Sequence, residues 1–318
     1  MCRGSPGPLN TPDPQEGTLS VLRPFDPWKS PLCTCPPQLT LNPYTGCGHR
    51  CAYCYITAYV RDAFNPRPKR DLISRLISDL KRLRPGTLVS MSLSSDPYTP
   101  PEGELRLTRR ALDLLLRAGA RVLMVTKSSL VARDADLLGR GRSAVMFTVT
   151  TLSEELASRL EPGAPPPRER LRAMSSLSAA GVPAGLRLDP IIPGVNDSPE
   201  EIERILEEAR RAGASHVVSS TYKARPDSLR RLAEALPEVA GALKSAYRSG
   251  ERVGGYLYLP KAARVRLMET VREAALRLGM TFATCREGLA HMNTPGVACD
   301  GSHLTLPDQG ARPTEKGY

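Results

Sequence analysis

Short apolar segments alternate with longer amphipathic segments along most of this chain, and this alternation constrains the fold more than any other feature. The amphipathic segments place leucines and isoleucines three or four residues apart, which predicts helices with one buried face. The apolar segments are short and bounded by turn formers, as buried strands are. We expect strands at 39–41, 87–93, 121–125, 144–149, 184–188, 216–219 and 280–284. We expect helices at 69–83, 102–118, 168–180, 199–212 and 261–278, together with one helix that ends at about residue 138 and one that begins at residue 153.

Strands that alternate with helices in this way form right-handed βαβ units around a parallel sheet. Six or seven units are too few for a closed eightfold barrel. The sequence therefore predicts an α/β protein with a parallel partial barrel, (β/α)6-type and TIM-like, with an N-terminal arm and a C-terminal extension. In such folds the loops that follow the carboxyl ends of the strands form the site.

We divide the chain into three parts. Residues 1–30 lack periodicity and are rich in turn formers, which predicts a flexible or extended arm. Residues 31–225 contain the barrel core, and residues 226–318 contain a helical extension, the last strand and a tail. The pattern is weakest between residues 237 and 260, where Gly254-Gly255 predicts a turn.

Five of the eight cysteines lie between residues 33 and 54, and three of them, Cys47, Cys51 and Cys54, have the spacing C-x3-C-x2-C. Three thiolates on one short loop can bind three irons of a [4Fe-4S] cluster and leave the fourth iron open for a substrate or cofactor. Zinc is the alternative, although structural zinc prefers two cysteine pairs that complete a tetrahedron. Tyr53, inside the loop, either shields the cluster and its ligand or only packs.

Four further cysteines are separate from this loop in the sequence: Cys33, Cys35, Cys285 and Cys299. Four thiols are the number that a second [4Fe-4S] cluster or a structural zinc requires. Alternatively they are isolated buried thiols, or Cys285 donates a hydrogen atom during catalysis. Two histidines near Cys299 could also replace a thiolate on a metal, namely His291 and His303.

The cysteine loop, with Tyr53-Cys54-Tyr55 and the preceding Asn42-Pro43-Tyr44-Thr45-Gly46, resembles the signature of the radical S-adenosylmethionine (SAM) superfamily, in its spore photoproduct lyase-like branch. Weaker similarities follow in order over residues 40–220, at Ser95-Asp96, Thr126-Lys127, Glu161-Pro162-Gly163, Arg170-Leu171 and Pro190-Ile191-Ile192-Pro193-Gly194. The resemblance implies an enzyme whose cluster reductively cleaves SAM to a 5′-deoxyadenosyl radical that abstracts hydrogen from a substrate. It also implies an electron donor of the ferredoxin or flavodoxin type.

The resemblance further implies which residues contact SAM. Ser94 and Ser95 match groups for the methionyl amine, Lys127 matches a lysine for the methionyl carboxylate, and Thr148 matches a serine with a similar role. A cation at the carboxyl end of a strand suits a carboxylate on electrostatic grounds as well. Without the resemblance, Lys127 is a solvated loop residue and Thr148 an ordinary strand residue.

One departure from the branch concerns the reaction. Leu93 occupies the position of a hydrogen-donating cysteine, and leucine cannot return a hydrogen atom in that way. Repair of a thymine dimer by the lyase mechanism is therefore not expected. The candidate catalytic residues are instead Cys285 and Tyr98.

The chain has 44 lysines and arginines against 33 acidic residues, a net charge of +11. This excess favours a nucleic acid as substrate, although arginines in surface ion pairs would also account for many of the cations. The alternatives are a radical SAM enzyme that modifies a protein or peptide with the help of an auxiliary cluster, and a non-catalytic iron–sulfur or zinc protein that binds RNA.

No apolar run is long enough to cross a bilayer, so no membrane partner is expected. The first residues lack the apolar segment of a secretory signal. Both observations predict a cytoplasmic location, where clustered cysteines are more often metal ligands than disulfides. The sequence does not indicate an oligomeric state.

Overall fold

The computed structural model describes residues 19–25, 30–92 and 94–307. Its centre is an eight-stranded sheet in the order β1-β2-β5-β6-β7-β8-β9-β12. The seven strands from β2 to β12 are parallel, and β1 pairs antiparallel with β2 at one edge. The strands span Arg23–Pro24 (β1), Leu39–Leu41 (β2), Leu88–Met91 (β5), Arg121–Thr126 (β6), Ser143–Thr148 (β7), Ala184–Ile191 (β8), Ala214–Thr221 (β9) and Thr281–Thr284 (β12).

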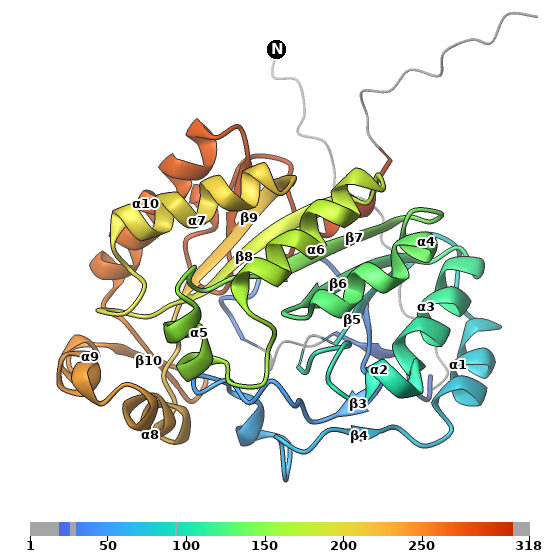
Figure 1. The fold of residues 1–318 in the computed structure, drawn as a ribbon, viewed down its shortest axis with the longest axis horizontal. Coiled ribbons are helices and arrows are strands. Elements are labelled where there is room, and N and C mark those ends of the chain that lie inside the picture. The colour runs from blue at the N-terminus through green and yellow to red at the C-terminus, as the bar shows by residue number, and fades with distance from the viewer. Residues whose placement is uncertain (1–18, 26–29, 93, 308–318) are drawn as a thin grey trace, which may run out of the picture.

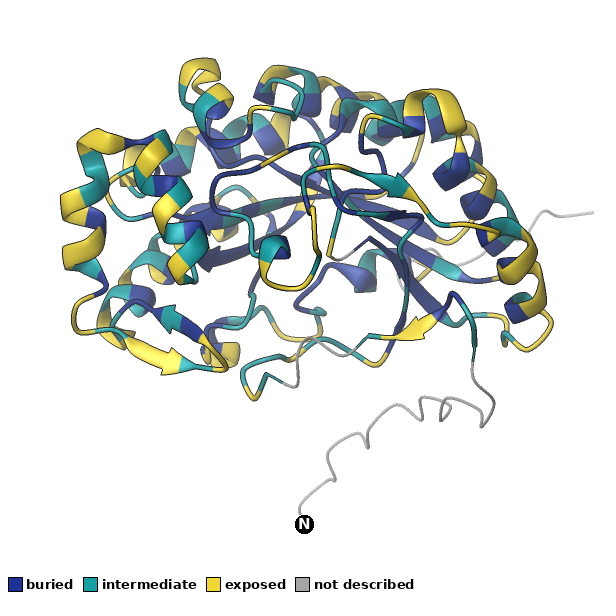
Figure 2. Ribbon diagram, turned by 90° about the horizontal axis from the view of Figure 1, so that it is seen from below, coloured by how far each residue is buried: buried dark blue, intermediate teal, exposed yellow. Residues whose placement is uncertain are grey.

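Helices cover the outer face of this sheet, where α3, α6, α7 and α10 pack against the strands (Figure 1). Figure 2 shows the strands buried in the middle and the exposed residues on the outer sides of the helices. The α-helices span Leu72–Leu80 (α1), Glu102–Leu105 (α2), Leu107–Arg117 (α3), Ala135–Leu138 (α4), Glu154–Leu160 (α5), Pro167–Ala179 (α6), Pro199–Arg211 (α7), Pro226–Ala235 (α8), Ala240–Ala246 (α9) and Lys261–Arg277 (α10). The 3-10 helices are Ile56–Ala58 (η1), Ser129–Asp134 (η2), Pro237–Val239 (η3), Ala290–Met292 (η4) and Ser302–Thr305 (η5).

The predicted α/β fold is confirmed, and each of the seven predicted strands overlaps an observed parallel strand. Within the described ranges no strand joins β1 to β12, so the barrel is open, as expected. Two short antiparallel pairs complete the structure. One pair is β3 (Tyr44–Thr45) with β4 (Arg67–Pro68). The other is β10 (Glu251–Val253) with β11 (Tyr256–Tyr258), and the predicted turn at Gly254-Gly255 joins these two strands.

The helix predicted over 102–118 is wrong in one respect, because it is broken at Arg106. Arg106 has a left-handed backbone with φ of 50°. The fully buried Glu102 carboxylate accepts hydrogen bonds from the Thr108 N–H at 2.7 Å and the Arg109 N–H at 3.2 Å. Glu102 therefore stabilises the start of α3 in the way that an N-cap does.

The arm expected over residues 1–30 is ordered in its described part, residues 19–25. Val21 and Leu22 are buried, and the Asp79 carboxylate accepts hydrogen bonds from both of their backbone N–H groups, at 2.8 and 2.9 Å. These bonds fasten the arm to α1 and place β1 beside β2. Residues 1–18 and 26–29 lie outside the described residues, as does Leu93. Among the described helices, none is both long and apolar enough to cross a membrane.

Candidate active site

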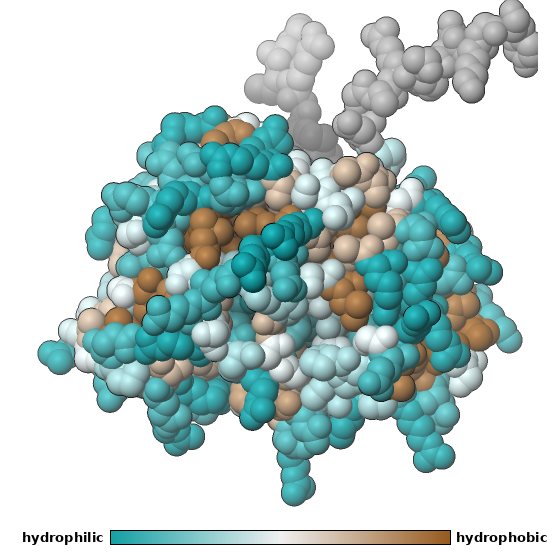
Figure 3. Space-filling view, viewed as in Figure 1, coloured by the Kyte–Doolittle hydropathy of each residue, from teal (hydrophilic) through white to brown (hydrophobic). Residues whose placement is uncertain are grey.

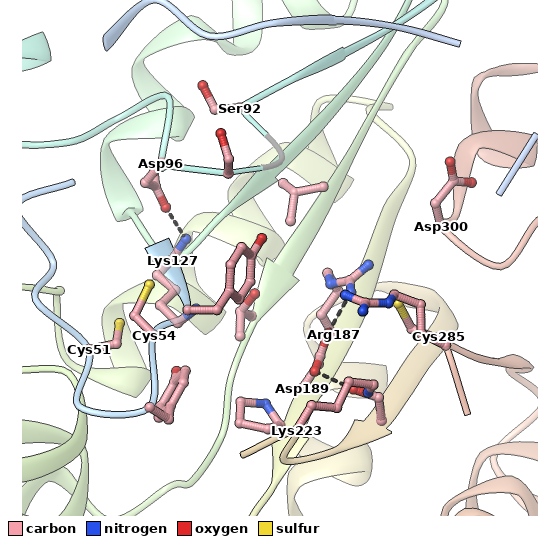
Figure 4. A pocket seen from close by; sticks show the side chains of 18 of the residues that line it. Cys51, Cys54, Ser92, Asp96, Lys127, Arg187, Asp189, Lys223, Cys285 and Asp300 are labelled. Carbon is pink, nitrogen blue, oxygen red and sulfur yellow. Dashed lines mark hydrogen bonds and ion pairs between the residues drawn. The ribbon is translucent and has the colours of Figure 1, made fainter. Parts of the chain in front are cut away.

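A cavity of about 250 Å³ lies at the carboxyl ends of the parallel strands, where the sequence predicted the site. The cysteine loop forms one wall, and the ends of β8 and β9 with the segment after β12 form the other (Figure 4). Predicted site residues that line it are Cys33, Cys35, Cys47, Cys51, Tyr53, Cys54, Ser94, Ser95, Lys127, Thr148 and Cys285. The fold therefore brings together residues that are up to 252 positions apart in the chain.

The loop that carries Cys47, Cys51 and Cys54 is held by backbone contacts rather than by regular structure. The Cys47 N–H donates to the Ala63 carbonyl at 2.8 Å. The loop also packs closely against the turn after α5: a Cβ atom on Gly163 would lie 2.0 Å from the Gly48 carbonyl oxygen. Only glycine allows this approach. The turn therefore sets the position of the three thiols.

An ion pair inside the cavity wall joins the cysteine loop to two strand ends. His49 Nδ1 lies 3.3 Å from Asp96 Oδ2. Burial lowers the pKa of His49, but its interactions with the Asp96 carboxylate and with Cys47 together raise it to about 10. Asp96 also accepts hydrogen bonds from Thr126 Oγ1 and the Lys127 N–H, both at 2.8 Å. His49 was not among the site residues predicted from the sequence, although it lies between two of the loop cysteines, Cys47 and Cys51.

A fully buried polar network lies behind Tyr53. The Tyr53 hydroxyl donates to the Glu161 carboxylate, which also forms an ion pair with Arg170 and accepts a hydrogen bond from Thr150 Oγ1 at 3.0 Å. Burial raises the pKa of the Glu161 carboxyl, but Arg170 and Lys127 lower it by more, so that Glu161 stays ionised. Tyr53 is thus positioned by a charge beneath the cavity.

Lys127 projects into the cavity with its ammonium 5.6 Å from the centre of the Tyr53 ring. Burial lowers its pKa, but its interactions with Cys51 and with the Glu161 and Asp96 carboxylates together raise it above the ordinary value, so Lys127 stays charged. Among the described side chains, no carboxylate lies within 4.0 Å of its nitrogen. This cation can therefore accept an anionic ligand.

Hydroxyl groups occupy the ends of β5 and β7. The Oγ atoms of Ser92 and Ser95 are buried, and neither has a hydrogen-bond partner in the described structure. Ser92 also has a positive φ of 59°, a strained conformation that is often found at functional sites. Thr148 is buried at the end of β7, whereas Ser94 is exposed and donates to Asn42 Oδ1 at 3.3 Å. Ser92 had not been identified from the sequence.

Tyr98 does not line the cavity, in contrast to its predicted catalytic role. It is buried in the core, and its hydroxyl donates to Asp134 Oδ2 at 3.1 Å. The turn at Asp96 directs the chain away from the cavity, because the Asp96 carboxylate accepts the Tyr98 N–H at 2.9 Å. Tyr53 and Tyr55, on either side of Cys54, are the tyrosines of the cysteine loop that line the cavity.

The opposite wall carries paired charges that were not predicted from the sequence. Arg187 Nη2 lies 2.6 Å from Asp189 Oδ2 at the end of β8, and Lys223 Nζ lies 2.9 Å from Glu287 Oε1. Arg187 could have been recognised in the sequence as a charged residue within the otherwise apolar strand predicted at 184–188. Nearer the hairpin, the guanidinium of Arg286 lies 4.9 Å from the centre of the Tyr256 ring.

The remaining cysteines meet across this wall. Cys33, Cys35 and Cys285 line the cavity, and the buried Cys299 has its Sγ 3.4 Å from the Sγ of Cys35. Within residues 19–25, 30–92 and 94–307, no three histidine, cysteine or acidic side chains already converge as the ligands of one metal ion.

The sequence model of the Radical SAM superfamily matches residues 41–209, more than half of the chain. The chain belongs to the radical SAM superfamily. It is therefore an enzyme, and the superfamily implies a [4Fe-4S] cluster and SAM. An uncharacterized protein of Mycobacterium tuberculosis, Rv2578c, is 29% identical over 256 residues, which cover 74% of this chain and 73% of the relative.

Two further similarities carry more descriptive names. The Radical SAM Nalpha-GlyT isomerase of Pseudomonas phage M6 is 24% identical over 285 residues, covering 84% of this chain and 58% of the phage protein. A solved structure of spore photoproduct lyase complexed with dinucleoside spore photoproduct superposes with a TM-score of 0.63 at 18% identity, covering 84% of this chain and 79% of the lyase. At this identity the similarity establishes the fold. The predicted resemblance to the lyase-like branch is therefore confirmed for the fold.

Proposed function

We propose that Cys47, Cys51 and Cys54 bind a [4Fe-4S] cluster and that SAM occupies the adjoining cavity. The observation that carries this proposal is the combination, in one cavity, of three thiols on one loop with an ammonium and a hydroxyl that have no partner among the described residues. When bound, the cluster supplies the electron that cleaves SAM reductively and yields a 5′-deoxyadenosyl radical for hydrogen abstraction. An external reductant of the ferredoxin or flavodoxin type completes the electron transfer.

The residues of this chain bind and orient SAM. The Lys127 ammonium suits the methionyl carboxylate, because a charge-assisted hydrogen bond in a partly buried site is strong. The Ser95 Oγ, which has no hydrogen-bond partner among the described residues, can accept a hydrogen bond from the methionyl amine, and Thr148 offers a second hydroxyl at the end of β7. Protonated His49 places a positive charge beside Cys47, which offsets the negative charge of the three thiolates.

Replacing Lys127 by methionine is expected to weaken SAM binding about 10- to 100-fold, because a hydrogen bond to a charged group contributes about 1.5–3 kcal/mol. Equilibrium dialysis of SAM against the reconstituted enzyme measures the change. Lys81→Met, an exposed lysine at the end of α1, is the matched control and should bind SAM like the wild type. Equal affinity for both variants would remove Lys127 from the SAM site.

For the substrate we propose a nucleic acid. Tyr55 and Tyr256 line the cavity, and Arg286 and Arg225 each lie 4.9 Å from the Tyr256 ring centre. Aromatic rings combined with arginines are the usual means of binding bases and backbone of single-stranded nucleic acid. The dinucleoside bound to the structurally similar spore photoproduct lyase agrees with this class of substrate. The lyase reaction itself is not proposed, because this chain has Leu93 at the position of the hydrogen-donating cysteine.

Surface ion pairs account for some of the arginines without explaining the net charge. Arg117 pairs with Asp113 at 2.9 Å and Arg277 with Glu203 at 2.8 Å, both on exposed helix faces. The face in Figure 3 is mainly hydrophilic, with apolar patches between the charged groups. Each pair uses one acidic residue for each cation, so the excess of +11 is left over. That excess is available for a polyanion.

The proposed function is tested with anaerobically reconstituted enzyme, dithionite and SAM, assayed for 5′-deoxyadenosine with and without single-stranded DNA or RNA. We expect nucleic acid to raise the rate of 5′-deoxyadenosine formation, and its affinity to fall with salt with a log–log slope of about −0.7 per phosphate contact. Arg286→Gln should reduce that slope by about 1, because one cation–phosphate contact is lost. Exposed Arg172→Gln on α6 is the control.

The outcomes of this experiment separate the two parts of the proposal. No 5′-deoxyadenosine from fully loaded enzyme would refute SAM cleavage. 5′-Deoxyadenosine formation without nucleic-acid binding at low salt would refute only the substrate class, and would favour a peptide substrate.

A further inference from the structure

The open side of the barrel is bridged by two segments that carry the four remaining thiols. One segment precedes β2 and contains Cys33 and Cys35; the other follows β12 and contains Cys285 and Cys299. Since β1 and β2 form one edge of the sheet and β12 forms the other, the thiols meet where the sheet does not close.

Hydrogen bonds hold both segments in this arrangement. Gln38, directly before β2, donates from Nε2 to Asp300 Oδ2 at 2.8 Å, next to Cys299. Beyond it, Arg121 of β6 donates to Thr305 Oγ1 at 2.9 Å and to the Ser302 carbonyl at 3.1 Å. The segment that carries Cys299 is thus tied to the inside of the barrel, and its thiol is presented to Cys35 by the fold.

Two of the four thiols are in direct contact, and the other two lie in the wall of the same cavity. Cys35 and Cys299 are in Sγ–Sγ contact at 3.4 Å. Cys33 lies two residues before Cys35, and Cys285 lines the same cavity as both of them. A disulfide requires about 2.05 Å between sulfurs, so the two thiols in contact are not bonded. Around one tetrahedral zinc, with Zn–S of about 2.3 Å, sulfurs lie roughly 3.8 Å apart, which is close to the separation observed.

We propose that Cys33, Cys35, Cys285 and Cys299 bind a second, thiolate-ligated metal centre that closes the open side of the barrel. Four-thiolate sites take either zinc or an iron–sulfur cluster, and the shared chemistry is a thiophilic metal held by deprotonated cysteines. Binding displaces the thiol protons to solvent and brings Cys33 and Cys285 onto the Cys35–Cys299 pair. Because three of these thiols line the cavity, the centre forms part of the wall that faces the substrate.

The nearby histidines do not compete for this role. His303 Nδ1 already accepts the Ala298 N–H at 3.2 Å, and its ring packs edge-on against His216 with centroids 4.5 Å apart. His291 is exposed on η4. The ligand set therefore consists of the four cysteines.

The test uses the full chain with Cys47, Cys51 and Cys54 replaced by alanine, so that no cluster forms on the first loop. It is loaded in two arms, with Zn²⁺ alone and, anaerobically, with Fe²⁺ plus sulfide, then desalted and analysed for metal and sulfide. We expect about one zinc per chain in the first arm or about four irons with sulfide in the second. Adding Cys35→Ser and Cys299→Ser should reduce the retained metal at least about 10-fold, since two of four ligands are lost.

Circular dichroism of each variant shows whether it is folded. If the multiple variant unfolds, the single variant Cys299→Ser is loaded in the same two arms, and its metal content is compared with that of the wild type. Retention in either arm that depends on Cys35 and Cys299 supports the proposal, and the arm identifies the metal. No retained metal, retention that is unchanged by the serine variants, or a Cys35–Cys299 disulfide in anaerobically purified protein would overturn it. The readout is metal content, so this result is independent of whether SAM is cleaved.

Discussion

Replacing Cys47, Cys51 and Cys54 together by alanine is expected to bring 5′-deoxyadenosine formation down to the level of an enzyme-free blank. These thiols share one loop at the cavity, with Lys127 beside Cys51. Without them the proposed cluster has no ligand beside the SAM site, so no electron reaches the sulfonium. Anaerobic assay with dithionite and SAM measures the loss.

Iron analysis gives the same prediction a second readout. The triple variant should lose about four irons per chain relative to loaded wild type, the content of one cubane. Cys2→Ala changes the one cysteine that is assigned to neither thiol group, and should behave like the wild type. Turnover above the blank in the triple variant would mean that other thiols generate the radical.

Replacing Arg170 by methionine is expected to lower the free energy of unfolding by about 3–5 kcal/mol. Arg170 and Glu161 are both fully buried, and Glu161 depends on Arg170 as its main counter-charge. Breaking a buried pair by removing one partner leaves an uncompensated charge in the core, which accounts for the size of the loss. Denaturant unfolding of the as-isolated proteins measures it.

The same change should also loosen the cysteine loop. Glu161 positions Tyr53, and the turn around it holds the loop through the Ala52 N–H, which donates to the Leu160 carbonyl at 2.8 Å. Faster loss of iron from the variant is therefore expected. Arg172→Met, two residues along α6 and exposed, is the matched control and should change stability by no more than about 0.5 kcal/mol. A loss of less than about 1 kcal/mol for Arg170→Met would show that another group compensates the Glu161 charge.

The parts of the fold that the sequence predicted well are those that depend on local patterning. The strands at 121–125 and 216–219 and the helix at 199–212 were recognisable because an apolar run or a helical stripe is written directly into the chain. The break at Arg106 was not, because arginine is a good helix former and the break depends on the buried Glu102 carboxylate.

The site residues also differ in how well the sequence predicts them. Cys47, Cys51 and Cys54 were identifiable because three cysteines at this spacing on one loop form a motif. Tyr98 was misplaced because its sequence position, near Asp96, does not show which way its side chain points.

The sequence by itself determined the order of strands and helices, the open parallel barrel and the cysteine loop, because each follows from the spacing of neighbouring residues. Only the tertiary structure decided that His49 meets Asp96, that Arg187 and Lys223 face the cysteine loop across one cavity, and that Cys35 touches Cys299. The physical reason is that such contacts join segments up to 264 positions apart in the chain. They form only when the folded sheet places the carboxyl ends of its strands side by side and lets the segments next to β2 and β12 meet across its open side.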